Sequence, residues 1–407
     1  MRERLRHVWA ALALMGSVCV WGGSAEAADL DLFVETPEAS RQAVSPNRAS
    51  APRDVAVMAG AVEALSRAAG RRLRIEIAPG VVVQAQRRAI DRQGAGQTAW
   101  SGDVADDDTG AVDLIVRGGK ITGQVTHGGR TWRISPADGP GMHRITPVPD
   151  VHMPPDIVLT PPGADRSRLF DGGRPEEPLA KTTSVARILI GYTPAAKASV
   201  SDIVAEAGLA VSLANGAFRR SGADLRLKLA GVKLVKLDEA TTDFAGVLSL
   251  ATAGTGPFRA LKKARNTTRS DFVAVLVANQ QYCGIAWLGP LEPYAYSVTS
   301  TPCISYHTFA HEVGHNIGLR HDRYVEAPAP VSQFNYGYVN KKAKIRDIMS
   351  YANACSAVGI TCTRVPMFST PAKKYKTEKI GVAKGRPGAA HTVRTINNNR
   401  KVVAGFR

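Results

Sequence analysis

The sequence has no apolar run long enough to be a permanent membrane-spanning helix. Its longest apolar stretch, at residues 8–21, is shorter than the ~20 residues that such a helix needs. Charged residues are also few, at 21% of the 407 positions against 44% apolar residues. The chain can therefore bury a core, which excludes general disorder. At roughly 100–200 residues per domain, the length predicts two or three domains.

The first 27 residues have the pattern of a secretory signal peptide. Arginines at positions 2, 4 and 6 precede the apolar stretch, and Ala25-Glu26-Ala27 has the A-x-A form of a cleavage site. An uncleaved membrane anchor is the alternative, which the short apolar run disfavours. We expect a secreted, extracellular protein, periplasmic only in transit.

Cysteine is scarce, and removal of the signal peptide would take Cys19 with it. An even four cysteines then remain, in an oxidising compartment where disulfides form by default. Four cysteines allow three pairings. We favour the local pairing, which joins Cys283 to Cys303 and Cys355 to Cys362.

Acidic residues are scarce in the second part of the chain. Residues 1–182 carry 22 basic and 22 acidic side chains, whereas residues 183–407 carry 30 and 13 and hold the whole net charge of +17. Such an excess suggests nucleic acid or an acidic surface as partner, but no nucleic-acid motif is present. We favour a solvated basic surface, because lysines cluster as on exposed faces: Lys341, Lys342, Lys344, Lys373, Lys374, Lys376 and Lys379.

Residues 28–152 predict a small β-rich domain. Helical spacing of apolar residues predicts one helix at 54–69. Alternating segments at 73–77 and 112–117, with Gly118-Gly119 and Gly128-Gly129, then predict antiparallel hairpins. Residues 153–182 are rich in proline and glycine, which is typical of an exposed linker that contains a processing site.

Residues 183–407 predict an α/β domain. Strand and helix patterns alternate there, and the strand at 272–278 is apolar throughout, as in the interior of a sheet. The expected strands are 186–192, 225–237 and 272–278, and the expected helices are 201–220 and 245–265.

A metal-binding pattern follows this α/β region. His311 and His315 are four residues apart, so on a helix both rings project from one face. Glu312 lies next to the first histidine, and Gly318 permits a sharp turn that brings His321 back. Three imidazoles suit a catalytic Zn²⁺ with one position left for water, which Glu312 can deprotonate. Three unrelated histidines at a helix end are the alternative, and the fixed offsets make it improbable.

This run resembles the signature of the metzincin metallopeptidases, H-E-x-x-H-x-x-G-x-x-H followed by a Met-turn. The Met-turn would be residues 347–351, with Met349 beneath the zinc. The resemblance implies an α/β (α+β) catalytic domain with a twisted mixed sheet and an active-site helix. Asp322 matches the reprolysin side of the group, where it supports the site without binding metal.

Softer matches at residues 283–288, 334–338 and 395–398 resemble bacterial secreted peptidyl-Asp metallopeptidases. That likeness implies a preference for acidic residues in the substrate, for which Arg320, Arg346 and Arg364 are candidate partners. Tyr351 matches turns in which a tyrosine stabilises the oxyanion. A packed, hydrogen-bonded tyrosine is the other interpretation of that residue.

We therefore expect a secreted, monomeric zinc metalloendopeptidase that hydrolyses peptide bonds with one catalytic ion and with Glu312 as general base. Its substrates would be proteins or peptides, added as a strand to a sheet edge at residues 294–299. Two alternatives are a metzincin-fold binding or adhesion protein and a zinc hydrolase acting on non-peptide amides. Structural calcium is not readable from the sequence.

The neutral N-terminal part predicts a propeptide that inhibits the enzyme intramolecularly, and a retained accessory domain is the alternative. No propeptide cysteine remains for a cysteine switch, so latency needs another ligand or plain occlusion of the cleft. Asp171 faintly resembles the aspartate switch of astacin propeptides. His127, His143 and His152 are the other candidates for a latency ligand. For each of them, and for Asp171, we favour the interpretation that the residue lies in an exposed loop.

Overall fold

The computed structural model describes residues 29–35, 51–67, 72–94, 96–149, 154–164, 169, 182–326 and 332–407. The predicted signal peptide at 1–27, with Cys19, lies outside the described residues. None of the helices in the described ranges is both long and apolar enough to cross a membrane.

The N-terminal part forms one ten-stranded sheet in the order β1-β4-β5-β6-β7-β8-β9-β10-β3-β2. Its neighbours pair antiparallel except β1 and β4. The hairpins expected at Gly118-Gly119 and Gly128-Gly129 are present. The strands are β1 (Leu30–Asp31), β2 (Phe33–Glu35), β3 (Arg53–Val57), β4 (Arg72–Ala78), β5 (Val81–Gln93), β6 (Gln97–Val104), β7 (Ala111–Arg117), β8 (Lys120–His127), β9 (Arg130–Pro136) and β10 (Met142–Val148).

The helix expected at 54–69 is wrong in its first half. Residues 53–57 form β3, which pairs with β2 and β10, and only α2 (Ala61–Ser66) is helical. The apolar positions fit both periods over so short a window, and pairing with two neighbouring strands decides in favour of a strand.

The second part is a mixed α/β structure around a six-stranded sheet in the order β11-β15-β16-β14-β12-β13. β12, β13, β14 and β16 run parallel, and β15 is antiparallel to β16. The strands are β11 (Asp156–Leu159), β12 (Ser184–Tyr192), β13 (Leu225–Leu234), β14 (Phe272–Val277), β15 (Gly284–Trp287) and β16 (Tyr296–Ser300).

Helices cover both faces of this sheet, which explains the continuous apolar strand β14. Alternate residues of β14 enter two separate cores: Phe272, Ala274 and Leu276 pack with α4, α7 and α9, and Val273, Val275 and Val277 with α5 and α6. The helices are α3 (Pro194–Ala198), α4 (Ile203–Ser221), α5 (Phe244–Ala253), α6 (Arg259–Thr267), α7 (Thr308–Ile317), α8 (Asn353–Ser356) and α9 (Thr392–Val403), with short 3₁₀ turns η3 (Gly256–Phe258), η4 (Glu292–Tyr294) and η5 (Thr301–Tyr306).

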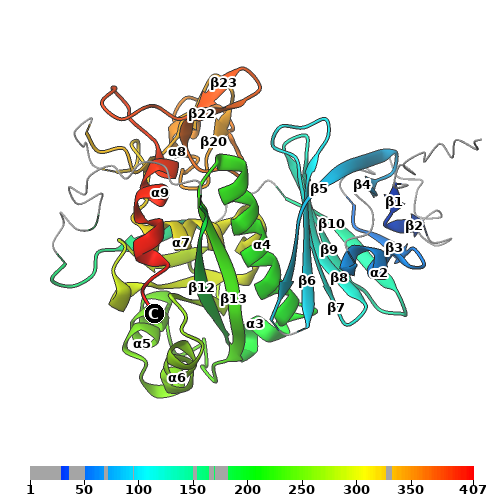
Figure 1. The fold of residues 1–407 in the computed structure, drawn as a ribbon, viewed down its shortest axis with the longest axis horizontal. Helices are drawn as coiled ribbons and strands as arrows, with labels where there is room; N and C mark the ends of the chain where they lie inside the picture. The colour runs from blue at the N-terminus through cyan, green and yellow to red at the C-terminus, as the bar shows by residue number, and fades with distance from the viewer. Residues whose placement is uncertain are drawn as a thin grey trace, which may run out of the picture.

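Helix α4 lies between the two sheets (Figure 1). Asp202 caps its start by accepting hydrogen bonds from the backbone N–H groups of Val204 and Ala205. Its outer side contacts β6, β7 and β8, where the Ser212 hydroxyl donates to Asp113 at 2.7 Å. The N-terminal sheet is therefore docked on the back of the helix layer that supports α7.

The prediction about the sheet edge is wrong. The segment expected as edge strand, 294–299, overlaps β16, which is interior because β15 pairs with its other side. The expected linker also contains β11, which pairs in parallel with β15. Prolines at 154–155 and 161–162 flank this short strand and hide it in a linker-like composition.

Short strands and the helices α8 and α9 make up the region after α7, and one disulfide lies on each side of α7 in the sequence. Cys283 is bonded to Cys303 and Cys355 to Cys362, which is the pairing we favoured. The strands are β17 (Arg320–Asp322), β18 (Tyr336–Gly337), β19 (Val339–Asn340), β20 (Ile345–Arg346), β21 (Thr363–Arg364), β22 (Thr370–Tyr375) and β23 (Glu378–Ile380).

Candidate functional site

Helix α7 carries the first two histidines and ends where the third must return. Gly318 has φ of 105°, in the left-handed region that favours glycine. The N–H of Leu319 bonds back to the Gly314 carbonyl at 3.0 Å and closes the last turn. The chain then reverses into β17, which holds His321.

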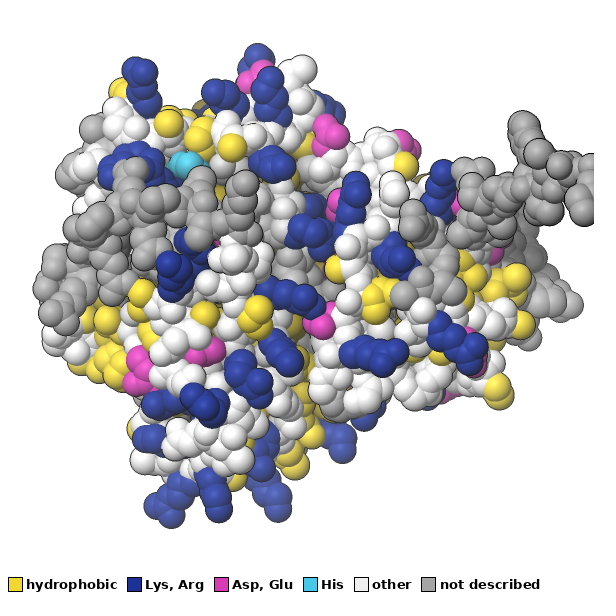
Figure 2. Space-filling view, viewed as in Figure 1, with side chains coloured by type: hydrophobic (Ala, Val, Ile, Leu, Met, Phe, Trp, Pro, Cys, Tyr) yellow, Lys and Arg dark blue, Asp and Glu magenta, His cyan; other side chains and the backbone are white. Residues whose placement is uncertain are grey.

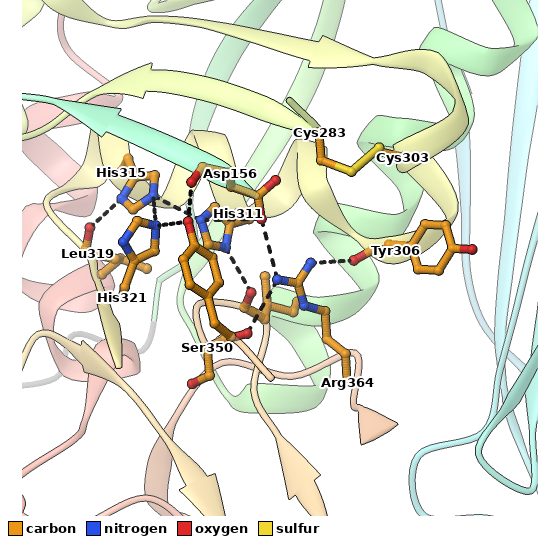
Figure 3. A network of polar contacts seen from close by, with 12 residues as sticks. Asp156, Cys283, Cys303, Tyr306, His311, His315, Leu319, His321, Ser350 and Arg364 are labelled. Atoms are coloured by element: carbon orange, nitrogen blue, oxygen red, sulfur yellow. Dashed lines mark hydrogen bonds and ion pairs between the residues drawn. A yellow bond between two sulfur atoms is a disulfide. The ribbon is translucent and has the colours of Figure 1, made fainter. Parts of the chain in front are cut away.

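The three histidines converge on one point. Nε2 of His315 lies 2.9 Å from Nε2 of His311 and 3.1 Å from Nε2 of His321 (Figure 3). All three side chains are buried, with exposed fractions of 0%, 0% and 7% for His311, His315 and His321.

The outward-facing ring nitrogens are fixed by neighbouring acceptors. Nδ1 of His311 lies 2.9 Å from the Ile348 carbonyl, and Nδ1 of His315 lies 2.8 Å from the Leu319 carbonyl. A carbonyl oxygen only accepts, so each Nδ1 carries the proton and each Nε2 has a lone pair. Nδ1 of His321 faces Oε1 of Glu326 at 3.4 Å.

This arrangement fits a divalent cation such as zinc. Burial, first of all, holds the pKa values of His311 and His315 well below their usual value, so the rings are neutral donors. Lone pairs that face one another at about 3 Å repel unless a cation lies between them. Fixed Nδ1 protons and inward Nε2 atoms are the usual surroundings of a zinc-binding histidine.

Glu312 faces the same space without a partner. Its side chain is completely buried, and among the described residues neither carboxylate oxygen has a hydrogen-bond partner. Burial, and then the nearby Asp156 carboxylate, raise its pKa well above the usual value. A buried, unpartnered carboxylate is costly for folding, which is typical of a group retained for chemistry.

Met349 lies directly behind α7. It is fully buried, and a Cβ added to Gly314 would come within 2.7 Å of its sulfur. The glycine is therefore needed for the close approach of the methionine to the active-site helix. Asp322 ties the two segments together, because its Oδ2 accepts the Tyr351 N–H at 2.9 Å.

The Tyr351 hydroxyl reaches the histidine cluster. It lies 3.0 Å from Nε2 of His321 and also donates a hydrogen bond to the backbone carbonyl of Asp156. Burial raises the pKa of Tyr351 above its usual value, so the hydroxyl stays protonated and can donate.

Asp156 is the site residue that sequence reasoning missed. Its Oδ2 lies 3.8 Å from Nε2 of His311 and 3.4 Å from a guanidinium nitrogen of Arg364. Asp156, His311 and Glu312 together offer ligand atoms within 4.8 Å of one another. The three-residue apolar run at 157–159, flanked by prolines, was the signal available in the sequence.

Of the three candidate arginines, Arg364 is the one whose guanidinium bonds to Asp156. It also donates to the Tyr306 and Ser350 carbonyls at 3.0 and 3.3 Å (Figure 3). Arg320 bonds to Glu326 and to the Tyr336 hydroxyl, and Arg346 donates to the Ser350 carbonyl.

The structure does not bring the other latency candidates to the site. His143 accepts the Ile121 N–H at 2.9 Å within the N-terminal sheet, and His127 lies 3.8 Å from Asp106 and Asp107. Asp171 and His152 lie outside the described residues.

Basic side chains are dispersed over the surface. Figure 2 shows Lys and Arg spread across the visible face of both parts, with fewer acidic side chains between them. All seven clustered lysines named above are exposed, which agrees with a solvated basic surface.

The chain is similar to known metallopeptidases in sequence. Residues 182–376 match the family model described as metallo-peptidase family M12B, reprolysin-like. A peptidyl-Asp metalloendopeptidase of Stenotrophomonas maltophilia (strain R551-3) is 26% identical over 76% of this chain and 74% of its own length. One of Xanthomonas campestris pv. campestris is 25% identical over 95% and 96%. The solved structure of metalloproteinase-II from Bacteroides fragilis has a TM-score of 0.43 at 10% identity, covering 83% of this chain and 94% of that one.

Proposed function

Because residues 182–376 belong to the reprolysin-like metallopeptidases of family M12B and the chain is a zinc metalloendopeptidase, we propose how its own residues perform the hydrolysis. His311, His315 and His321 hold one catalytic zinc ion, and Glu312 is the general base. The convergence of three Nε2 atoms beside an unpartnered, buried Glu312 is the observation that carries the proposal.

The residues around the metal have different proposed roles. Bound zinc supplies a Lewis acid that polarises the scissile carbonyl and acidifies the attacking water. Glu312 takes one proton from that water and passes it to the leaving amine as the C–N bond breaks. Met349 supports α7 from behind, and Gly318 and Asp322 fix the return of His321 and the position of Tyr351.

Tyr351 stabilises the oxyanion in this proposal. Its hydroxyl now donates to a backbone carbonyl at the sheet edge, that of Asp156. A substrate carbonyl at the same position would receive the same hydrogen bond, which strengthens as negative charge develops on its oxygen.

The substrate chain is proposed to add to β15. Backbone hydrogen bonds at this edge are currently made with the chain's own segment: the Cys283 N–H donates to the Pro155 carbonyl at 3.1 Å and the Leu288 N–H to the Leu159 carbonyl at 2.9 Å. An extended peptide can use the same groups, once β11 has left.

Arg364 is the proposed partner of an acidic substrate residue. The relatives are named peptidyl-Asp metalloendopeptidases, and Arg364 is the candidate arginine that binds Asp156, the carboxylate on the Nε2 side of His311. Its side chain is 11% exposed, so a charge-assisted hydrogen bond there is shielded from water and strong.

The chain is further proposed to be a secreted, monomeric zymogen. Residues 1–27 would be the signal peptide, 28–152 the propeptide, 153–182 the connecting segment with the processing site, and 183–407 the catalytic domain. Two disulfides support an oxidising compartment.

Removal and return of the metal test this function. The processed enzyme should contain one zinc per chain and cleave a denatured protein. A chelator should abolish cleavage and zinc should restore it. A processed chain that binds zinc but cleaves only non-peptide amides, or nothing, would contradict an endopeptidase and favour the alternative hydrolase or binding protein.

A further inference from the structure

We infer that Asp156 is a blocking ligand that the chain supplies to its own metal site, and that the enzyme stays latent while β11 occupies the edge of the sheet. The inference rests on the proposed function, since it assumes zinc at the three histidines.

The Asp156 carboxylate has the position and environment of a metal ligand. Its side chain is 4% exposed, its Oδ2 lies 3.8 Å from Nε2 of His311, and Oδ1 has no hydrogen-bond partner among the described residues. Two carboxylates, Asp156 and Glu312, are thus buried together beside the Arg364 guanidinium, with Arg346 near enough to act electrostatically on Asp156. A divalent cation would balance this negative charge, and without it the burial is costly.

Several contacts hold Asp156 in place. β11 pairs with β15 over four residues, from Asp156 opposite Gly284 to Leu159 opposite Trp287. Tyr351 donates to the Asp156 backbone carbonyl and Arg364 to its carboxylate. The Asp156 carboxylate is therefore held beside the histidines both by main-chain pairing and by side-chain hydrogen bonds.

Apolar anchors continue along the same segment. Ile157 and Leu159 pack against the core formed with α5. Further along, Leu169 is 1% exposed, and a Cβ added to Gly318 would meet its carbonyl oxygen at 3.1 Å. The segment thus contacts both the edge strand and the turn that returns His321.

Latency follows because the segment occupies both the substrate-binding edge and a position at the metal. β11 uses the backbone groups of β15 that a substrate strand needs, and the Asp156 carboxylate takes the metal position that the attacking water needs. Cleavage of the chain on the C-terminal side of β11 would not by itself break the pairing of β11 with β15. Activation therefore requires that the segment also dissociates or is degraded.

The decisive variant is Asp156→Asn, which keeps the shape but removes the charge. Asp138→Asn is the matched control, because Asp138 is exposed on the N-terminal part. Both are made in the full-length chain with Glu312→Gln, which prevents self-processing, and zinc affinity is measured by competition with a chelator. Loss of a ligand should weaken affinity at least as much as loss of a residue that only orients one, about 10-fold or more.

Latency is measured in the same pair of variants with Glu312 intact. The unprocessed Asp156→Asn chain, checked by intact mass, should cleave a peptide that the unprocessed wild-type and Asp138→Asn chains leave uncut, because β11 loses the carboxylate contacts that hold it at the edge and dissociates from β15 more readily. Because the segment leaves on processing, the mature enzyme from Asp156→Asn should have wild-type activity, which shows that the variant folds.

Unchanged zinc affinity or unchanged latency in Asp156→Asn would overturn the inference. In that case a mature enzyme that still binds zinc and cleaves peptides would leave the proposed function standing. Absence of zinc or cleavage in the mature wild-type enzyme would instead contradict the proposed function itself.

Discussion

Arg364 lies 208 positions after Asp156 in the chain, yet its Nη2 is 3.4 Å from the Oδ2 of that residue. The contact joins β21, beyond the methionine segment, to β11 at the sheet edge. The Asp156 carboxylate therefore lies between the Arg364 guanidinium and the His311 ring. Under the proposed function and the proposed latency, the same arginine serves both self-inhibition and the choice of acidic substrates.

Arg364→Gln should remove the preference for acidic substrates. A hydrogen bond to a charged group contributes about 1.5–3 kcal/mol, which corresponds to about a 10- to 150-fold change. We expect kcat/KM for an aspartate-containing peptide to fall by about this factor in the processed enzyme, with little change for the matched asparagine peptide.

The comparison of the two peptides is the internal control, because structural damage would slow both equally. Arg386→Gln, at an exposed arginine, should leave the ratio of the two rates unchanged. An equal loss for both peptides in Arg364→Gln would assign the arginine a structural role only.

Tyr351→Phe should lower kcat with little effect on KM. The hydroxyl is proposed to donate to the oxyanion only as charge develops, and removal of one such donor costs about 10²–10³-fold in rate. Steady-state kinetics of the processed enzyme give the two constants separately. A kcat within about threefold of wild type would favour the packed-tyrosine interpretation.

Met349→Ala should destabilise the catalytic region. Truncation of a fully buried methionine leaves a cavity and costs about 2–5 kcal/mol, whereas Met349→Leu nearly conserves volume and should cost less than about 1.5 kcal/mol. Denaturant unfolding of the zinc-loaded enzyme measures both variants. Equal, small losses would mean that the packing behind α7 does not depend on this side chain.

The free energy of unfolding should fall with acid because of His391. Burial, and then the charge of Arg394, lower its pKa in the folded state to about 4 from the ordinary 6.5. The unfolded chain therefore takes up a proton below pH 6.5 that the folded chain resists, so stability is lost as the pH falls from 6.5 to about 4. The slope from one proton is about 1.4 kcal/mol per pH unit.

The variant His391→Gln tests this slope. Unfolding is followed from pH 4 to 6.5 with excess chelator, so that metal release contributes equally in both proteins. The dependence on pH should become shallower by about one proton in the variant. Identical slopes would show that His391 titrates normally in the folded protein.

The convergence of the three histidines could be predicted from sequence because the residues are local. His311 and His315 share one helix face, and Gly318 turns the chain so that His321 returns within six residues. The α/β order could be predicted for the same reason, since strands such as β14 carry their own apolar pattern.

Asp156 could not be predicted, because its position depends on pairing between segments more than 120 residues apart. A four-residue strand between prolines has too few positions to show a period. The prediction of an edge strand at 294–299 is wrong for the same reason. β15 is also only four residues long, and its antiparallel pairing with β16 is what makes β16 an interior strand.

The most direct test of the account is the processed Glu312→Gln enzyme, produced with an added protease. The proposed mechanism requires the carboxylate for proton transfer but not for metal binding. We expect one zinc per chain, as in wild type, and peptide cleavage reduced by about 10²–10⁴-fold. Cleavage within tenfold of wild type, with zinc bound, would contradict the assignment of Glu312 as general base.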